Sequence, residues 1–127
     1  MSFLRAWRTP FEAEELPSVW VTCDGDLSNT TVFVGLPAKW QIDFEHIVGM
    51  KVSDETYDHN RRFHVERDDD TLCSYTWENS PWLANFDAEY VKVLGGSKVT
   101  HYVLLGGDYN VEILAYGRLE ITAVKSL

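Results

Sequence analysis

The stretch WQIDFE, residues 40–45, decides the class of fold predicted for this chain of 127 residues. Its three apolar residues alternate with three polar ones, which is the period of a β-strand that buries one face and leaves the other in water. Apolar residues continue over 47–52, so we predict one long strand. Gly49 marks a bulge or bend at which the buried face switches.

Similar period-two or β-branched patterns recur on both sides of this strand. Turn residues at 24–29 and 106–108 separate pairs of such runs and predict two hairpins. Cys73, Tyr75 and Trp77 are predicted to share one face of their strand. Because strands and helices do not alternate regularly, the sheet is predicted to be antiparallel. The predicted strands are residues 18–23, 31–34, 40–52, 62–67, 72–77, 101–105 and 111–115, the last with an extension over 119–123.

One amphipathic helix is predicted in the second half of the chain. Ser80 is a good N-cap, and Pro81 is suited to the first helical position. Apolar residues recur at helical spacing over 83–94, and the glycines at 95–96 supply a left-handed ending. We therefore predict a helix over 81–94 that packs on the sheet.

Together these patterns predict one α+β domain covering residues 1–127. Its centre is an antiparallel, strongly twisted or barrel-like sheet of about six to eight strands with one main helix. Residues 1–17 are predicted to be a lead-in segment that packs on or beside the sheet and contains a short N-terminal helix. With 45% hydrophobic residues, a chain of this length needs no disulfide or metal to fold.

The charge balance restricts the kind of partner. Lys and Arg total 11 against 20 for Asp and Glu, a net charge of -9, so the average field repels phosphate backbones and anionic lipids. We predict no nucleic-acid partner and no membrane partner. Cys23 and Cys73 form no zinc or redox pattern, and no apolar stretch of signal-peptide length is present, which indicates a cytoplasmic protein.

Charge is densest over residues 54–70, where carboxylates, imidazoles and arginines are interspersed. Such groups can bind a divalent ion or divide acid and base roles. The spacing argues against both, because His59 and His64 are five residues apart at a predicted strand start and point in different directions. We therefore predict that this region binds no metal and no cofactor and that it forms a partner-binding surface. Its candidate residues are Asp54, Glu55, Asp58, Glu66, Asp68, Asp69 and Asp70.

Aromatic residues, 13% of the chain, exceed what one small core easily takes up. Trp20 and Tyr116 fall on the faces opposite the aliphatic residues of their strands, so both faces of the sheet carry aromatics. In a closed sheet these side chains would line a cavity for a small apolar ligand. The alternative is that the helix and the N-terminal segment cover both faces. The ligand-lining candidates are Trp20, Trp40, Tyr75, Trp77, Tyr102 and Tyr116.

Three functions stay open at this point. Acidic residues with aromatic anchors favour a non-enzymatic binding protein that docks a basic protein partner. The alternative is a carrier or sensor of a small apolar ligand, and the third is a small hydrolase or isomerase, which needs His64, His101 and Glu66 to converge. An exposed edge strand would also support a homodimer. Small acidic inhibitors and immunity proteins share the general profile, although no motif identifies such a family.

Overall fold

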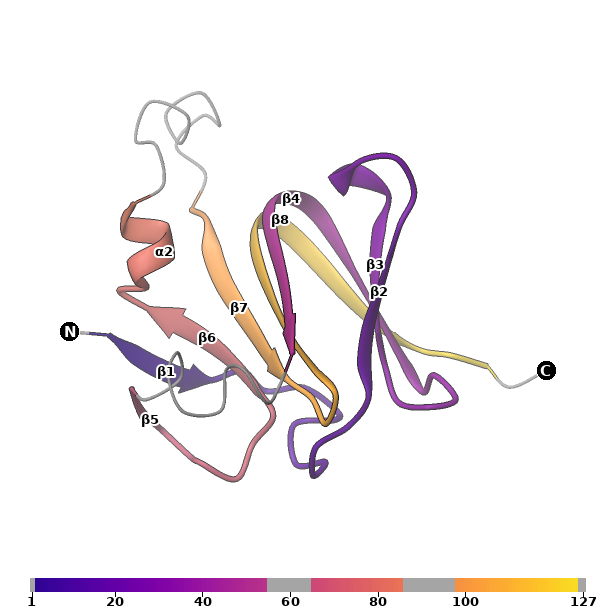
Figure 1. Cartoon of the computed structure of the whole chain (residues 1–127), viewed down its shortest axis with the longest axis horizontal. Helices are drawn as coiled ribbons and strands as arrows, with labels where there is room; N and C mark the ends of the chain where they lie inside the picture. Colours follow the sequence, from indigo (N-terminus) through magenta and orange to yellow (C-terminus); the bar gives the residue numbers. More distant parts are fainter. Residues whose placement is uncertain (1, 55–64, 86–97, 126–127) are drawn as a thin grey trace.

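Eight strands form one sheet in the computed structural model of the chain, which describes residues 2–54, 65–85 and 98–125 (Figure 1). The spatial order of the strands is β2-β3-β4-β8-β7-β6-β1-β5. Neighbours are antiparallel except for β1 and β5, so the sheet is mixed. The elements are β1 (Phe3–Ala6), β2 (Val19–Cys23), the short 3-10 helix η1 (Leu27–Asn29), β3 (Thr30–Val34), β4 (Trp40–Asp54), β5 (Glu66–Arg67), β6 (Ser74–Glu78), α2 (Pro81–Ala84), β7 (Thr100–Leu105) and β8 (Tyr109–Ala123).

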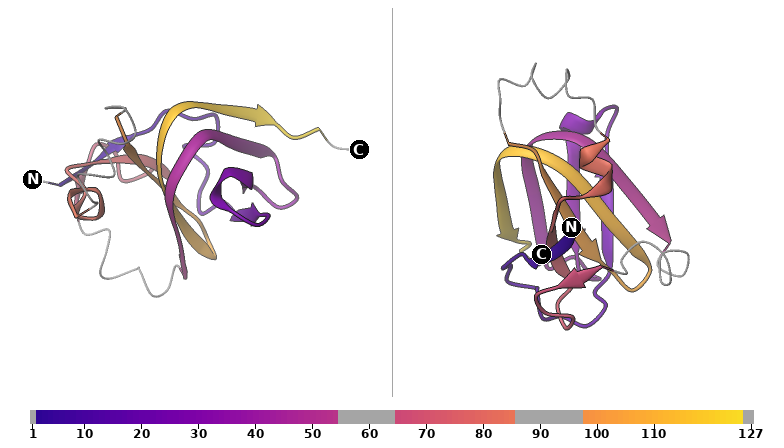
Figure 2. Two further views of the ribbon diagram at one scale, coloured as in Figure 1. Left: turned by 90° about the horizontal axis from the view of Figure 1, so that it is seen from above. Right: turned by 90° about the vertical axis from the view of Figure 1, so that its left-hand side faces the viewer.

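β4 and β8 are each 15 residues long and bend together, which folds the sheet over (Figure 2). Their register shifts between Phe44 and His46 and again between Ile47 and Gly49. Such bulges let a strand bend and increase its twist. On β8 the bend includes Gly117 at φ +83, where a Cβ would collide with a side chain of β4. The second of these two register shifts confirms the bulge or bend predicted at Gly49.

The bend divides the sheet into two layers. The first layer holds β2, β3, the beginning of β4 and the end of β8, because β3 pairs with β4 only over residues 40–42. The second layer holds the rest of β4 and the beginning of β8, where β7 pairs with residues 110–115, and continues through β6, β1 and β5. In the described part of the chain β2 and β5 remain as edges, so the sheet formed there does not close into a barrel.

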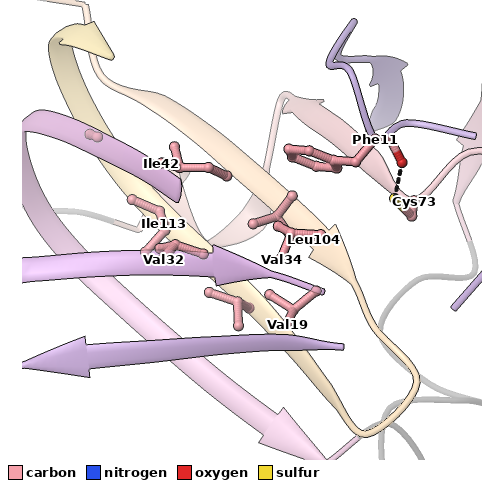
Figure 3. Close-up of a cluster of buried hydrophobic side chains, with 10 residues drawn as sticks. Phe11, Val19, Val32, Val34, Ile42, Cys73, Leu104 and Ile113 are labelled. Carbon is pink, nitrogen blue, oxygen red and sulfur yellow. Dashed lines mark hydrogen bonds between the residues drawn. The ribbon is translucent and has the colours of Figure 1, made fainter. Parts of the chain in front are cut away.

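The main core lies between the two layers (Figure 3). Alternate side chains of β2, β3 and β4 point at those of β7 and β8, as the period of two requires. Phe11 and Cys73 extend this core, and the Cys73 thiol donates to the carbonyl of Phe11 at 3.2 Å. The buried members are Phe11, Val19, Val32, Val34, Ile42, Cys73, Leu104, Val111, Ile113 and Ala115.

A second apolar cluster lies on the outer face of the second layer. Leu4, Tyr75 and Val103 are fully buried there. The ring of Trp82, from α2, lies against the same layer, and Gly49 makes room for it, because a Cβ at that position would approach the ring to 2.9 Å. The second layer is therefore covered on both faces.

The predicted helix over 81–94 is wrong, although its start is confirmed. Ser80 caps the first turn of α2, which nevertheless ends at Ala84. The side-chain amide of Asn85 donates to a carbonyl of that turn at 2.9 Å, which satisfies the helix end locally. Residues 86–94 lie outside the described part of the chain.

The N-terminal region also differs from prediction. Residues 3–6 form β1 rather than a short helix, because they add to the sheet between β6 and β5. The predicted all-antiparallel sheet is wrong for the same reason, since β1 runs parallel to β5. Trp7 and Thr9 then attach the lead-in segment to β6 through Ser74, whose hydroxyl donates to the Trp7 carbonyl at 2.8 Å.

Two strand predictions also need correction. Cys73 does not share a face with Tyr75, because it precedes β6 and packs between the layers. Only residues 66–67 of the predicted strand over 62–67 are described as strand, and residues 62–64 lie outside the described ranges.

Candidate functional site

Loops from three parts of the chain meet at one end of the sheet, and we call residues 8–17, 66–73 and 106–109 the acidic end. The Cys73 amide donates to the Glu12 carbonyl at 2.8 Å, and the Gly107 amide donates to the Pro17 carbonyl at 2.9 Å. These ranges contain eight carboxylates and two arginines. Because hydrogen bonds hold these three segments together, carboxylates that are distant in sequence add their negative charge at the same end of the sheet.

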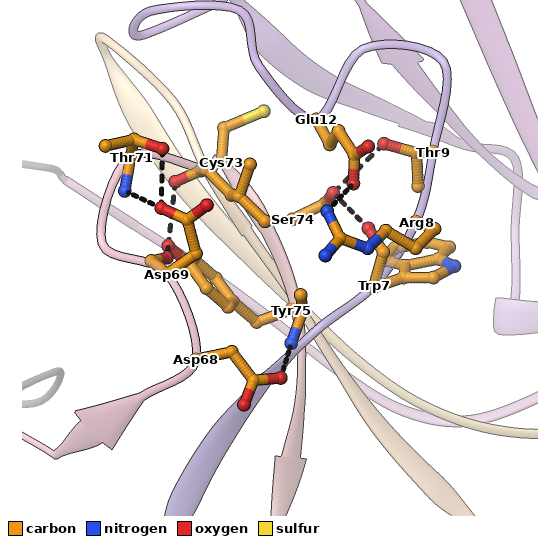
Figure 4. Close-up of polar contacts among 12 residues, drawn as sticks. Trp7, Arg8, Thr9, Glu12, Asp68, Asp69, Thr71, Cys73, Ser74 and Tyr75 are labelled. Atoms are coloured by element: carbon orange, nitrogen blue, oxygen red, sulfur yellow. Dashed lines mark hydrogen bonds and ion pairs between the residues drawn. The ribbon is translucent and has the colours of Figure 1, made fainter.

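Two of the predicted partner-binding residues accept hydrogen bonds from backbone amides (Figure 4). Asp68 accepts from the amide of Ala6 at 2.9 Å. Asp69 accepts from the amide of Thr71 at 2.9 Å and from its hydroxyl at 2.5 Å, and these hydrogen bonds hold the pKa of Asp69 below its usual value. Both carboxylates therefore shape the loop as well as charging it.

The other predicted carboxylates differ in accessibility. Asp54, Glu66 and Asp70 are exposed, while Glu55 and Asp58 lie outside the described residues. Asp54 ends β4 opposite Tyr109, next to the acidic end. Beside β5 the surface is hollowed into an open depression of about 650 Å³, lined by Phe3, Val65, Glu66, Arg67, Asp68, Asp69 and Asp70.

Apolar side chains are exposed among these acids. Leu16 is 61% exposed and lies against Gly107, and Tyr109 is 48% exposed. Burial, together with the nearby Glu14 carboxylate, raises the pKa of the Cys73 thiol to about 12. The thiol beneath the loops is therefore protonated and unsuited to nucleophilic chemistry. The acidic end thus combines exposed carboxylates with exposed apolar side chains.

The six predicted ligand-lining aromatics do not line one space. Tyr75 and Trp77 belong to the cluster outside the second layer, whereas Trp40 and Tyr102 pack against the core between the layers. The remaining two have local partners on the surface of the fold. The Trp20 ring stacks on Phe33 at 4.3 Å, and the Tyr116 ring stacks on His46 at 4.7 Å.

A buried polar network that the sequence analysis missed lies on the outer face of the second layer. His101 Nε2 is 2.8 Å from Glu112 Oε1, and His101 Nδ1 is 2.6 Å from Ser80 Oγ. Ser80 and His101 are 1% exposed and Glu112 is fully buried. Trp77 stacks on the imidazole at 5.1 Å, and Trp82 meets it edge-on at 5.3 Å. The network joins α2 to β7 and β8.

The order serine, histidine, carboxylate is that of a catalytic triad, but the setting is structural. Ser80 Oγ already accepts from the Leu83 amide at 3.0 Å and is closed off from solvent. The following residue, Pro81, has no N–H to offer an oxyanion. The two ring nitrogens of His101 each have a hydrogen-bond partner, Ser80 on one side and Glu112 on the other, so the imidazole links these two side chains.

Of the three residues predicted for a hydrolase or isomerase, the two that the structure describes do not lie together. Glu66 is exposed on β5, His101 is buried, and His64 lies outside the described residues. One signal for the network exists in the sequence: His101 and Glu112 are polar residues at apolar-facing positions of two hairpin strands, and a buried polar residue needs a partner.

Among residues 2–54, 65–85 and 98–125, no three His, Cys, Asp or Glu side chains gather in a group that could hold a metal ion. Within the same ranges, no helix has the length and apolar character needed to cross a membrane. Comparisons with protein-family models, with curated proteins and with solved structures find no match to this chain.

Proposed function

We propose that the chain is a non-enzymatic acidic binding protein that docks a basic protein partner at its acidic end. The observation that carries this proposal is that backbone hydrogen bonds hold together the loops that carry exposed carboxylates, such as Asp70, and the exposed apolar side chains of Leu16 and Tyr109. Charges of one sign speed the encounter with an oppositely charged partner, and apolar side chains supply the buried contacts. The proposed role is analogous to that of small acidic inhibitors and immunity proteins as a class.

The other two functions have less support. A carrier of an apolar ligand needs aromatics around a shared cavity, and the candidates are divided between two clusters and the surface. An enzyme needs reactive groups that a substrate can reach, and Ser80 and His101 of the polar network are buried. The net charge of -9 favours a basic partner over an acidic one.

The test measures how fast a basic protein captured from the native host associates with the chain. Asp70→Lys is the informative variant, because Asp70 is exposed and forms no hydrogen bond or ion pair with a described residue. Asp68 and Asp69 are left in place, since their carboxylates hold the loop. We expect association to slow severalfold at about 50 mM salt and the difference to shrink at about 300 mM.

A matched control separates local from overall charge. Asp24→Lys makes the same charge change at the exposed turn between β2 and β3, away from the acidic end. It is expected to alter association much less than Asp70→Lys. Equal association rates for the wild type and both variants would show that the acidic end does not steer the partner.

A further inference from the structure

No described element packs over the outer face of the first layer, whereas the outer face of the second layer is covered. Inward positions of its strands fill the main core, so the alternate side chains point outward. Side-by-side pairing places Trp20 beside Phe33, Phe33 beside Gln41, and Gln41 beside Thr122. We call this surface the Trp20 face; its residues are Trp20, Phe33, Gln41, Thr122, Asp43 and Glu120.

An aromatic anchor lies at one side of this face. The Trp20 ring stacks on Phe33 at 4.3 Å with an angle of 20° between the rings, and its indole N–H donates to the Gly35 carbonyl at 3.3 Å. The side chain is thus held in place while 36% of the residue stays exposed. A fixed, exposed tryptophan loses little conformational freedom on binding and is a common energetic centre of protein interfaces.

Two carboxylates lie directly opposite one another at the other side of the face. Asp43 on β4 pairs with Glu120 on β8, and like charges at directly opposite positions destabilise a sheet. Gln41 donates to Asp43 at 2.9 Å, but neither carboxylate forms an ion pair with a described residue. A cation placed between them would relieve the repulsion.

We propose that the Trp20 face is a second docking surface for a basic protein partner, with Trp20 as the apolar anchor and Asp43 and Glu120 as acceptors for a lysine or arginine side chain. The inference rests on the proposed function and adds a second contact surface to it. Charge complementarity selects this occupant. A second copy of the chain would bring acidic pairs together, which costs free energy.

The test uses an alternating arginine–leucine hexapeptide as the probe, followed on the isotope-labelled full chain by amide chemical shifts at about 50 mM salt. Saturable shifts are expected at Trp20, Asp43 and Glu120. Glu120→Lys is expected to weaken this binding about tenfold, whereas the charge-matched Asp24→Lys changes it less than about twofold. The all-glutamate analogue of the peptide is expected not to bind.

A second measurement needs no probe. Glu120→Lys is expected to raise the melting temperature, because it replaces repulsion opposite Asp43 with attraction. Binding and stability then move in opposite directions, which a merely structural role for Glu120 would not produce. A lower melting temperature would contradict the strain between the two carboxylates and overturn the inference.

The outcomes separate the two proposals. Peptide shifts confined to the acidic end would overturn the Trp20 face as a docking surface and leave the proposed function standing. Absence of saturable shifts at both surfaces would overturn both proposals. Shifts at the Trp20 face that Glu120→Lys leaves unchanged would show that the opposed carboxylates do not receive the cation, and would also overturn the inference.

Discussion

The buried network and the acidic end hold clustered polar side chains in opposite ways. Ser80, His101 and Glu112 are at most 1% exposed and hydrogen-bond to one another, whereas Asp70 and Asp108 are exposed. A buried polar group must find a partner or it destabilises the fold, while an exposed charge is hydrated and acts through its field. The network therefore contributes to the stability of the fold, whereas the acidic end presents its charge to solvent.

Removal of His101 is expected to have the largest effect. His101→Ala takes away the hydrogen bond to a fully buried carboxylate, so the free energy of unfolding should fall by about 3 kcal/mol. Urea unfolding measures this change. The matched control is His46→Ala, which removes an exposed imidazole stacked on Tyr116 and should cost less than about 0.5 kcal/mol. Similar losses for the two variants would contradict the structural role of the network.

The next effect concerns the cap of α2. Ser80→Ala removes both the acceptor for the Leu83 amide and the partner of His101, and should lower the free energy of unfolding by about 1–2 kcal/mol. The comparison variant is Asp26→Ala, because Asp26 caps η1 in an exposed loop. The loss from Asp26→Ala is expected to be smaller. An equal or larger loss at Asp26 would count against the importance of burial.

A smaller effect is expected at Asp69, and it depends on pH. The hydrogen bonds from Thr71 depress the pKa of Asp69 in the folded state, so they stabilise the fold fully above the unfolded value of about 3.9. This contribution is lost as the pH falls through the lower, folded value. Thermal unfolding should therefore show Asp69→Ala as less stable than wild type at neutral pH, with the gap closing below about pH 4. A gap that is independent of pH would contradict this origin.

The smallest effect on stability is expected for Asp70→Lys. Because the side chain is exposed and forms no hydrogen bond or ion pair with a described residue, the free energy of unfolding should stay within about 0.5 kcal/mol of wild type. Urea unfolding checks this value on the same sample used for partner association. A large loss of stability would mean that Asp70 belongs with the structural residues, and slower association of that variant would then carry no information.

Local patterns in the sequence predicted most of the strands. Alternation of side chains is a property of neighbouring residues, so the long strand from Trp40 and the hairpin around 106–108 were predicted correctly. The division into two layers was not predicted, because it depends on how β4 pairs with β8 across distant residues. The helix was predicted too long, since apolar spacing over 83–94 says nothing about the capping by Asn85.

The candidate sites show the same limit. The acidic run 68–70 was evident from composition, but the contribution of residues 12–15 and Asp108 depends on loops that meet only in the folded chain. The network of Ser80 with His101 and Glu112 joins three segments, and no short motif encodes it. Sequence spacing finds sites made within one segment more readily than sites assembled from several.

The long pairing of β4 with β8 has a consequence for biosynthesis. Residues 55–108 separate the two strands, so β4 leaves the ribosome well before its partner exists. During that interval an extended, apolar-rich strand is open to pairing with other nascent chains, and contacts so distant in sequence form slowly. Changes in β8 should therefore reduce the yield of folded protein in the cell, and chaperone supply should influence that yield, even where the purified protein is fully stable.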